Sequence, residues 1–220
     1  MAALSQQHWE TVPDTIRHIW PTLARQPFIG QFYLAGGTAL ALRLGHRRSV
    51  DLDFFPIDRE VDDPIRREIV TSLSAVAEVL VLENVFGNLL LTVDGVRTGF
   101  FGYGYPLVQP LSEADGILLA SLADIGLMKL DAVSDRANRK DFYDLYQIAQ
   151  LIPLDALVSM TKTKYPLVRD FEFMVYRGLT FFDVADRQAD PELLIDLTWD
   201  TVRMFFIDQA RQLARKWFEE

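Results

Sequence analysis

The stretch that decides the fold runs from residue 34 to residue 55 and reads LAGGTALALRLGHRRSVDLDFF. Its first part predicts a strand that ends in a tight turn at Gly36-Gly37, after which a short helix begins. Its last part predicts a second strand, on which Asp51 and Asp53 project to the same side because strand residues two apart share a face. This order places two carboxylates beside a glycine turn at the start of a helix.

Such an arrangement predicts a site for a metal-bound nucleoside triphosphate. Neighbouring carboxylates such as Asp51 and Asp53 repel each other, and a divalent cation compensates their charge. Mg²⁺ (or Mn²⁺) suits them, because it takes carboxylate oxygens and leaves positions for water and phosphate. Gly36 and Gly37 let a phosphate approach the backbone, and a helix that starts at Thr38 directs N–H groups toward it. Taken singly, Gly-Gly is typical of an ordinary turn and Asp-x-Asp of a solvated strand end. The two in this order favour phosphoryl-transfer chemistry.

The pattern of apolar residues changes near residue 108. Before it, strand-like runs alternate with helical patterns, and after it apolar residues recur at helical spacing. We therefore predict an α+β (α/β) fold, with a mixed β-sheet core over residues 1–108 and a helical region over residues 109–220 packed against it. The expected strands are Gln31–Ala35, Val50–Phe55, Val79–Glu83, Asn88–Val93 and Val96–Tyr103, with a type I′ hairpin at Asp94-Gly95. The expected helices are Thr38–Leu44, Asp62–Val79 (capped by Asp62 or Asp63), Ser121–Val133, Asn138–Leu151, Leu154–Lys162, Arg169–Thr180 and Asp190–Trp217.

Composition excludes several classes of protein. The chain has no cysteine, which rules out disulfides, thiolate catalysis and cysteine-bound zinc. A net charge of −9 argues against non-specific binding of nucleic acid, although a local basic cleft remains compatible with it. The N-terminal MAALSQQHWE lacks the pattern of a signal peptide, and no apolar run approaches the roughly 20 residues that span a bilayer. A cytoplasmic location without a membrane partner is expected.

A second group of charged residues lies in the helical half. At about 100° per residue, Lys129, Arg136 and Lys140 fall within about 40° of each other if one helix continues, or resumes in phase, between them. One face would then offer three cations to a triphosphate or its transition state. The alternative is ordinary helix chemistry, in which Asn138 is a cap and Asp141 complements the helix dipole. Because the first motif already indicates a phosphate site, we interpret Lys129 and at least one of Arg136 and Lys140 as phosphate contacts.

Residues 36–55 resemble the first motif of the AbiEii/AbiGii-type nucleotidyltransferases, the toxin components of phage-defence toxin–antitoxin pairs. The family elements Gly-Gly-Thr-Ala-Leu, His-Arg-x-Ser and Asp-x-Asp-Phe stand here at Gly36–Leu40, His46–Ser49 and Asp51–Phe54. A second family block consists of a lysine, an arginine and Lys-Asp-x-x-Asp-Leu. It matches Lys129, Arg136 and Lys140–Leu145.

The resemblance implies a nucleotidyltransferase fold and the transfer of a nucleotidyl group from a nucleoside triphosphate to an acceptor. It also suggests RNA, such as a tRNA end, as the acceptor. A cognate antitoxin is the protein partner that it suggests. Asp51 and Asp53 would hold the metal, Lys129 would balance the triphosphate charge, and Asp141 would activate the acceptor hydroxyl. The nucleotide-binding residues would be Gly36, Gly37, Thr38, Arg47, Ser49, Arg136 and Lys140. No catalytic step is assigned to His46.

The chain departs from the family pattern at Gly99. Relatives tend to carry Val-Lys-Val-Asp-Phe on a strand next to the metal site, whereas residues 96–100 read VRTGF. Asp94 cannot replace the missing third acid, since it lies about 17 Å away at about 3.4 Å per strand residue. We favour the interpretation that Asp141 or Asp144 supplies the third oxygen. The alternative is a catalytically impaired protein of the same fold that binds a nucleotide or a protein partner.

Another enzyme class also uses an Asp-x-Asp motif. Glycosyltransferases bind the metal–diphosphate of a sugar nucleotide with it, but they usually need a larger nucleotide-binding domain before the motif than the residues preceding Asp51 provide. Donor preference, a nucleoside triphosphate or a nucleotide sugar, separates the two classes.

Overall fold

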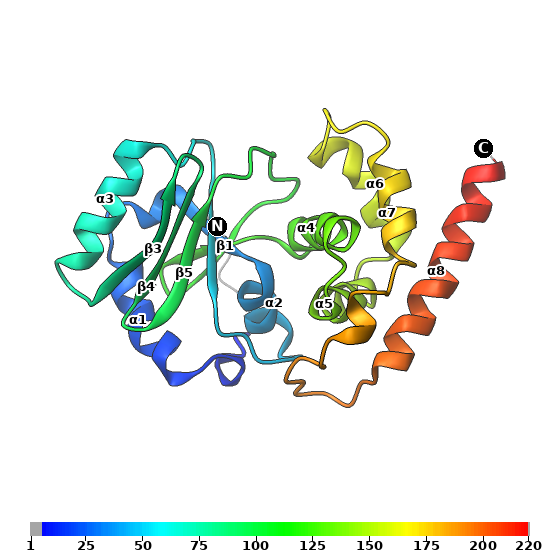
Figure 1. The fold of residues 1–220 in the computed structure, drawn as a ribbon, viewed down its shortest axis with the longest axis horizontal. Coiled ribbons are helices and arrows are strands. Elements are labelled where there is room, and N and C mark those ends of the chain that lie inside the picture. Colours follow the sequence, from blue (N-terminus) through cyan, green and yellow to red (C-terminus); the bar gives the residue numbers. More distant parts are fainter. Residues whose placement is uncertain (1–5, 220) are drawn as a thin grey trace. The chain divides into compact units, whose positions relative to one another are not determined.

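The fold was analysed in a computed structural model that describes residues 6–219 (Figure 1). Residues 1–5 of the N-terminal stretch, in which no signal peptide was found, lie outside the described residues, as does residue 220. The chain forms two compact units, of which the first ends at Ser121 and the second begins at Leu122. The expected boundary at residue 108 precedes a short hairpin, Ser112–Leu119, whose strands belong to the sheet of the first unit.

The first unit is built on a mixed sheet. Its described residues form seven strands in the order β3-β4-β5-β2-β1-β7-β6, so that β2 lies in the middle. β2 is antiparallel to β1 and parallel to β5, and β1 is parallel to β7. The strands are β1 (Phe32–Ala35), β2 (Leu52–Pro56), β3 (Val79–Val85), β4 (Asn88–Val93), β5 (Val96–Phe101), β6 (Ser112–Ala114) and β7 (Ile117–Leu119). The helices are α1 (Asp14–Ala24), α2 (Gly36–Leu44) and α3 (Asp63–Ser74), with 3-10 turns at Trp9–Thr11 and Ile29–Gln31.

Strand alternation gives the sheet a buried face. Leu52 and Phe54 of β2 are fully buried, whereas Asp53 between them is partly exposed. Phe100 of β5 packs against the rings of Phe54 (centroids 5.2 Å apart) and Phe32 of β1 (5.1 Å). Burial of these apolar rings holds β1, β2 and β5 together. The opposite face of β2 carries Asp53, and we call it the polar face although Phe55 also lies on it.

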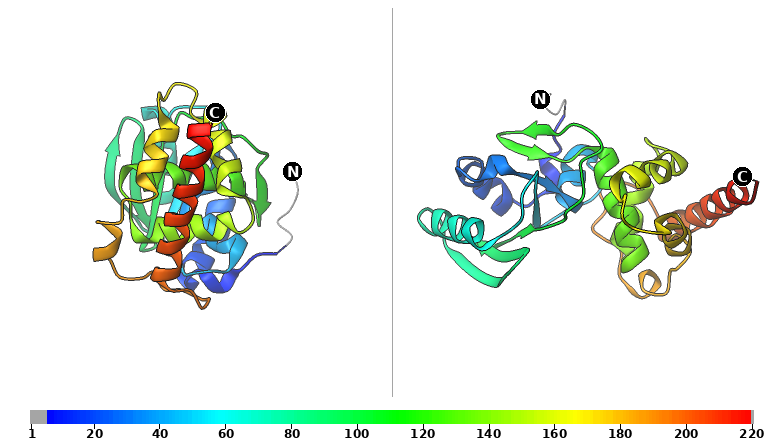
Figure 2. Two further views of the ribbon diagram at one scale, coloured as in Figure 1. Left: turned by 90° about the vertical axis from the view of Figure 1, so that its right-hand side faces the viewer. Right: turned by 90° about the horizontal axis from the view of Figure 1, so that it is seen from above.

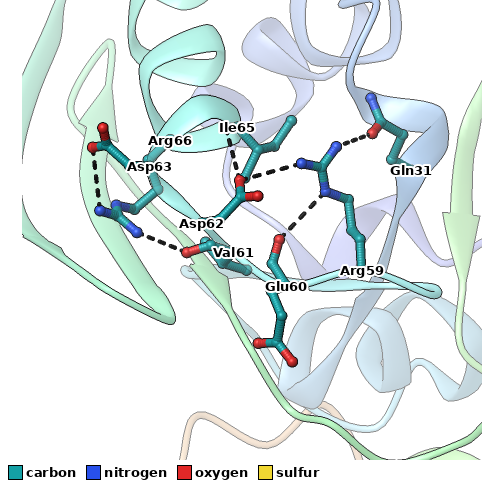
Figure 3. A network of polar contacts seen from close by, with 8 residues as sticks. All are labelled: Gln31, Arg59, Glu60, Val61, Asp62, Asp63, Ile65 and Arg66. Carbon is teal, nitrogen blue, oxygen red and sulfur yellow. Dashed lines mark hydrogen bonds and ion pairs between the residues drawn. The ribbon is translucent and has the colours of Figure 1, made fainter.

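The N-terminus of α3 is held by a network of polar contacts (Figure 3). Asp62 is the helix cap and accepts a hydrogen bond from the Ile65 backbone N–H at 3.1 Å, which confirms one of the two predicted caps. Arg59 contacts both Asp62 and the side chain of Gln31, and Arg66 donates to the Val61 carbonyl at 2.8 Å. This network ties the segment after β2 to the beginning of α3.

The predicted strands of the first unit are confirmed with shifts at their ends, and Asp94-Gly95 forms the predicted hairpin with positive φ at both residues. Two features were not predicted. Helix α1 carries its buried residues at helical spacing, and the β6–β7 hairpin turns at Asp115-Gly116, again with positive φ at both residues. Both signals are present in the sequence, but each segment is short and interrupted by polar residues. Helix α3 also ends at Ser74, earlier than expected, and residue 79 begins β3.

The second unit is helical. It consists of α4 (Leu122–Asp135), α5 (Arg139–Ala149), α6 (Leu154–Lys164), α7 (Phe171–Gly178), a 3-10 turn (Ala185–Arg187) and α8 (Trp199–Glu219). The long helix α8 runs past α5 and α7 (Figure 2). Phe142 of α5 forms the aromatic centre of this unit, with Phe182, Trp199 and Phe206 around it at centroid distances of 5.3, 5.7 and 5.3 Å. A fully buried ion pair, Lys164 Nζ to Asp124 Oδ1 at 2.9 Å, joins α6 to α4.

The last helix begins later than predicted. Asp190 does not cap it, since its carboxylate accepts a hydrogen bond from the Tyr143 hydroxyl at 2.7 Å and contacts Arg139 at 2.8 Å. Residues 190–198 are not helical, and the helix begins at Trp199. The hydroxyl of Thr198 accepts a hydrogen bond from the Thr201 N–H at 3.3 Å and takes the capping role.

Candidate active site

The turn between β1 and α2 is crowded on its outer side. Gly36 has a φ of +65°, and a β-carbon built on it would lie 3.0 Å from the carboxylate oxygen Oδ2 of Asp53. A β-carbon on Gly37 would overlap the guanidinium of Arg47 and lie 3.1 Å from Ser49 Oγ. Both glycines are therefore required by the close approach of these side chains. The predicted meeting of the Gly-Gly turn with the acidic strand is observed directly.

The loop between α2 and β2 is fastened to the first turn of α2. The hydroxyl of Thr38 is hydrogen-bonded to Ser49 Oγ at 2.8 Å and donates to the backbone carbonyl of Asp51. Arg47 is buried and donates to the Arg48 carbonyl at 2.8 Å. His46 is also buried. These contacts hold the arginine and the two hydroxyls beside the N-terminus of a helix, where an anion is stabilised.

Asp51 and Asp53 lie at the start of the central strand. Asp51 precedes β2 and Asp53 is its second residue, and both are partly exposed while Leu52 between them is buried. The alternation puts both carboxylates on the polar face of the sheet. Arg97 of β5 lies on this face too, with Nη1 4.0 Å from Asp51 Oδ2. Sequence reasoning missed Arg97, although its position two residues before Gly99 indicated that it would share the face.

The chemistry of these donors fits a hard divalent cation. Asp51 and Asp53 offer only carboxylate oxygens, which suit Mg²⁺ or Mn²⁺, and their partial exposure leaves space for water and phosphate. Among the described residues, no group of three or more acidic, histidine or cysteine side chains is placed to hold a metal. Asp51 and Asp53 are thus a pair of candidate ligands.

Lys129, Asp141 and Asp144 form a buried ion cluster within the helical unit. Lys129 Nζ lies 2.7 Å from Asp141 Oδ1 and 2.7 Å from Asp144 Oδ2, and both carboxylates have no exposed surface. Arg136 completes the cluster, with Nε 2.9 Å from Asp141 Oδ2 and a side chain that is 53% exposed. The second sequence block thus comes together in space as one charged group that joins α4 to α5.

The helical phase assumed for the three cations is wrong. α4 ends at Asp135 and α5 begins at Arg139, with Ala137 in the left-handed conformation at a φ of 48°. The two helices are therefore separate, and no common phase relates Lys129 to Lys140. Lys140 is exposed, whereas Lys129 is buried.

The sequence identifies the family. Residues 19–199 match the family described as nucleotidyl transferase AbiEii toxin, type IV TA system. The chain belongs to this AbiEii family. It is 36% identical over 185 residues to the Aquifex aeolicus (strain VF5) protein aq_aa25, covering 82% of this chain and 87% of that protein. The resemblance inferred from the two sequence blocks is thereby confirmed.

Solved structures share the fold of this chain. JHP933 from Helicobacter pylori superposes with a TM-score of 0.54 at 18% identity, over 92% of this chain and 90% of that one. The antibiotic-resistance factor ANT(2″)-Ia superposes with a TM-score of 0.52 at 14% identity, over 66% of this chain and 87% of that one. These similarities confirm the nucleotidyltransferase fold. Among the helices in the described part of the chain, none is long and apolar enough to cross a membrane.

A change at the glycine turn tests how tightly the AbiEii-family site is built. Replacing Gly36 by alanine should destabilise the protein by about 1–2 kcal/mol, because φ is positive and the new methyl group meets Asp53. Urea unfolding measures the change in the free energy of unfolding. Gly30→Ala is the matched control, since a β-carbon there meets nothing within 4 Å, and its effect should be small. Equal losses of unfolding free energy in the two variants would contradict the close approach of Asp53 to Gly36.

Acid should weaken the ion cluster of the helical unit. Burial by itself raises the pKa of Asp141, but the charges of Lys129 and Arg136 outweigh it and hold this pKa below its ordinary value of 3.8. The resulting stabilisation is fully present above pH 3.8 and is lost as the pH falls through the lower folded-state pKa. Urea midpoints of wild type and Asp141→Asn should therefore converge as the pH falls below 3.8. If the two urea midpoints stayed the same distance apart down to the lowest pH, the protonation of Asp141 would not be linked to stability.

Proposed function

We propose that the protein transfers a nucleotidyl group from a nucleoside triphosphate to an acceptor, as the toxin of a toxin–antitoxin pair. Membership of the AbiEii family supports the general activity and the toxin role. The observation that carries the proposal is the packing of the Asp53 carboxylate against Gly36, at the N-terminus of α2. A strand of two aspartates, a bare backbone turn and a helix N-terminus meet there, as a metal-bound triphosphate requires.

The residues of the first unit would act on the phosphates. Asp51 and Asp53 would hold Mg²⁺ (or Mn²⁺), which when bound neutralises phosphate charge and polarises the phosphorus under attack. The backbone of Gly36, Gly37 and Thr38 would receive phosphate oxygens. The guanidinium of Arg47, packed over Gly37, and the hydroxyl of Ser49 would orient them. These roles follow from groups that lie within one unit.

The residues of the second unit divide into two kinds. Arg136, whose side chain is 53% exposed, and Lys140, which is exposed, are the cations that this unit offers as candidate contacts for a triphosphate. Lys129 and Asp141 are buried in the ion cluster, and the lowered pKa of Asp141 disfavours it as a proton acceptor for the acceptor hydroxyl. We therefore assign Asp141 the positioning of Lys129 and Arg136.

A transfer assay with two labels tests the activity. The purified protein would be incubated with each of the four nucleoside triphosphates, labelled at the α- or the γ-phosphate, with Mg²⁺ and total RNA. Label from the α-phosphate, and none from the γ-phosphate, should appear in RNA or on the protein and should be lost with chelator. Transfer of γ-label would instead indicate a kinase, and transfer from a labelled nucleotide sugar would indicate a glycosyltransferase.

The acceptor and the partner are separate parts of the proposal. RNA, such as a tRNA end, is the acceptor that the family resemblance suggests, and the net charge of −9 requires that it be recognised by a local site. A cognate antitoxin would suppress growth inhibition when co-expressed with the chain. Growth inhibition that Asp53→Asn relieves would tie toxicity to the metal site.

A binder without transfer activity is the second candidate, because Gly99 stands where relatives tend to carry a third acid. In this case wild type would bind triphosphate without transferring label, and Gly99→Asp combined with Phe101→Ala would gain activity. A Gly99→Asp change meets the ring of Phe101, so it needs Phe101→Ala beside it to fit.

A further inference from the structure

Gly99 occupies the position next to Asp53 on the polar face of the sheet. β2 and β5 are parallel neighbours, and their register pairs Asp53 with Gly99. Side chains at paired positions of adjacent strands project to the same face, about 5 Å apart. An acidic residue at position 99 would therefore stand beside Asp53 and share a cation with it.

The ring of Phe101 fills this position. A β-carbon built on Gly99 would overlap Cε2 and Cζ of Phe101, which therefore folds back along β5 over the glycine. The Phe101 ring also packs against Phe55 of β2, with ring centroids 6.1 Å apart. Phe55 in turn packs against Tyr103 at 5.6 Å. Aromatic carbon thus stands where the third carboxylate would otherwise lie.

The charge on this face is also unfavourable to two cations. Two divalent ions in a phosphoryl-transfer site lie about 3.5–4 Å apart and repel strongly, so that bridging carboxylates must offset them. Asp51 and Asp53 supply two negative charges, and Arg97 adds a positive one 4.0 Å from Asp51. In residues 6–219 no group of three or more acidic, histidine or cysteine side chains is placed to hold a metal ion.

We propose that this site binds one divalent cation together with the nucleotide, because the ring of Phe101 covers Gly99 at the place where a third carboxylate would have to stand to hold a second cation. The inference rests on the proposed function, since it concerns the cation of the same site. Phe101 acts by occupying space and touches no reacting atom in this proposal, so it is a selectivity residue for the metal. The alternative is that the Phe101 ring only covers a bare glycine. It would then stabilise the strand and have no effect on the number of cations bound.

The number of bound cations can be counted directly. Wild type would be dialysed against Mn²⁺ and the α,β-methylene analogue of each of the four nucleoside triphosphates, in which the bond that nucleotidyl transfer breaks is blocked. We expect one protein-bound Mn²⁺ per bound nucleotide. Gly99→Asp/Phe101→Ala should bind two, with the exchange-coupled paramagnetic resonance signal of Mn²⁺ ions about 4 Å apart. Phe101→Ala alone is the matched control and should remain at one, because it opens the space without adding a carboxylate.

The outcomes separate this inference from the proposed function. Two coupled Mn²⁺ ions in wild type would overturn the inference and leave nucleotidyl transfer standing. A double variant that folds, binds the analogue and holds one Mn²⁺ would show that Phe101 and Gly99 do not set the number. If wild type binds neither Mn²⁺ nor any of the four analogues, the proposed function fails and the inference fails with it. Should the double variant not fold, the wild-type count alone decides between one cation and two.

Discussion

Replacing Asp53 by asparagine should reduce nucleotidyl transfer about a thousandfold, equivalent to about 4 kcal/mol of transition-state stabilisation. The change keeps the size of the side chain and removes the negative charge that lies against Gly36. Because Asp53 is partly exposed and shares its face with Asp51, losing one of two like charges should leave the fold stable. Initial rates of α-label transfer at saturating Mg²⁺ measure the effect.

The matched control for this change is Asp14→Asn. Asp14 stands in the first turn of α1 with a side chain that is 97% exposed, so the same chemical change there should leave the transfer rate within about twofold of wild type. Thermal unfolding of both variants checks that the fold is kept. If Asp53→Asn retained more than about a tenth of the wild-type rate while Mg²⁺ is still required, the metal would be bound elsewhere.

Replacing Lys129 by methionine should lower the free energy of unfolding by about 3–5 kcal/mol, the usual loss when one partner of a buried ion pair is removed. The lysine is 5% exposed and lies 2.7 Å from each of two fully buried carboxylates. Arg136 still contacts Asp141, so Asp144 loses more of its compensating charge. Urea unfolding at neutral pH gives the change.

Two further variants isolate the cause. Lys162→Met removes a lysine whose side chain is 82% exposed and pairs with Glu172 at 3.3 Å, so it should change stability little. Lys129→Met combined with Asp144→Asn should recover part of the loss, because the buried negative charge is removed with its partner. A Lys129→Met protein as stable as wild type but unable to bind triphosphate would instead assign the lysine to the substrate directly.

The position of the two carboxylates in the first unit could be predicted because its signals are local. A strand fixes which of two neighbouring residues share a face, so Asp51 and Asp53 are placed together by spacing alone. Their approach to Gly36 was also expected, since the turn directly precedes the helix that leads to the acidic strand. The Asp94-Gly95 hairpin was predicted for the same reason, because its conformation depends on those two residues.

The helical unit was harder to predict because its contacts join separate helices. The break at Ala137 ends α4, and this turn removes the common phase expected for Lys129 and Lys140. Asp190 illustrates the same limit: it has the sequence pattern of a helix cap, yet Tyr143 and Arg139, far away in sequence, take its carboxylate. Local propensity is overridden wherever a tertiary partner offers a better hydrogen bond.

The sequence by itself therefore determined the family, the fold class and the two carboxylates beside the glycine turn, because these depend on residue type and short-range spacing. Only the tertiary structure decided that Lys129 is buried between Asp141 and Asp144, and that the ring of Phe101 occupies the place beside Asp53. Each of these two features depends on side chains from different turns or strands that meet at one place in the folded protein. Exclusion of water and close packing select that arrangement, and residue spacing along the chain does not encode it directly.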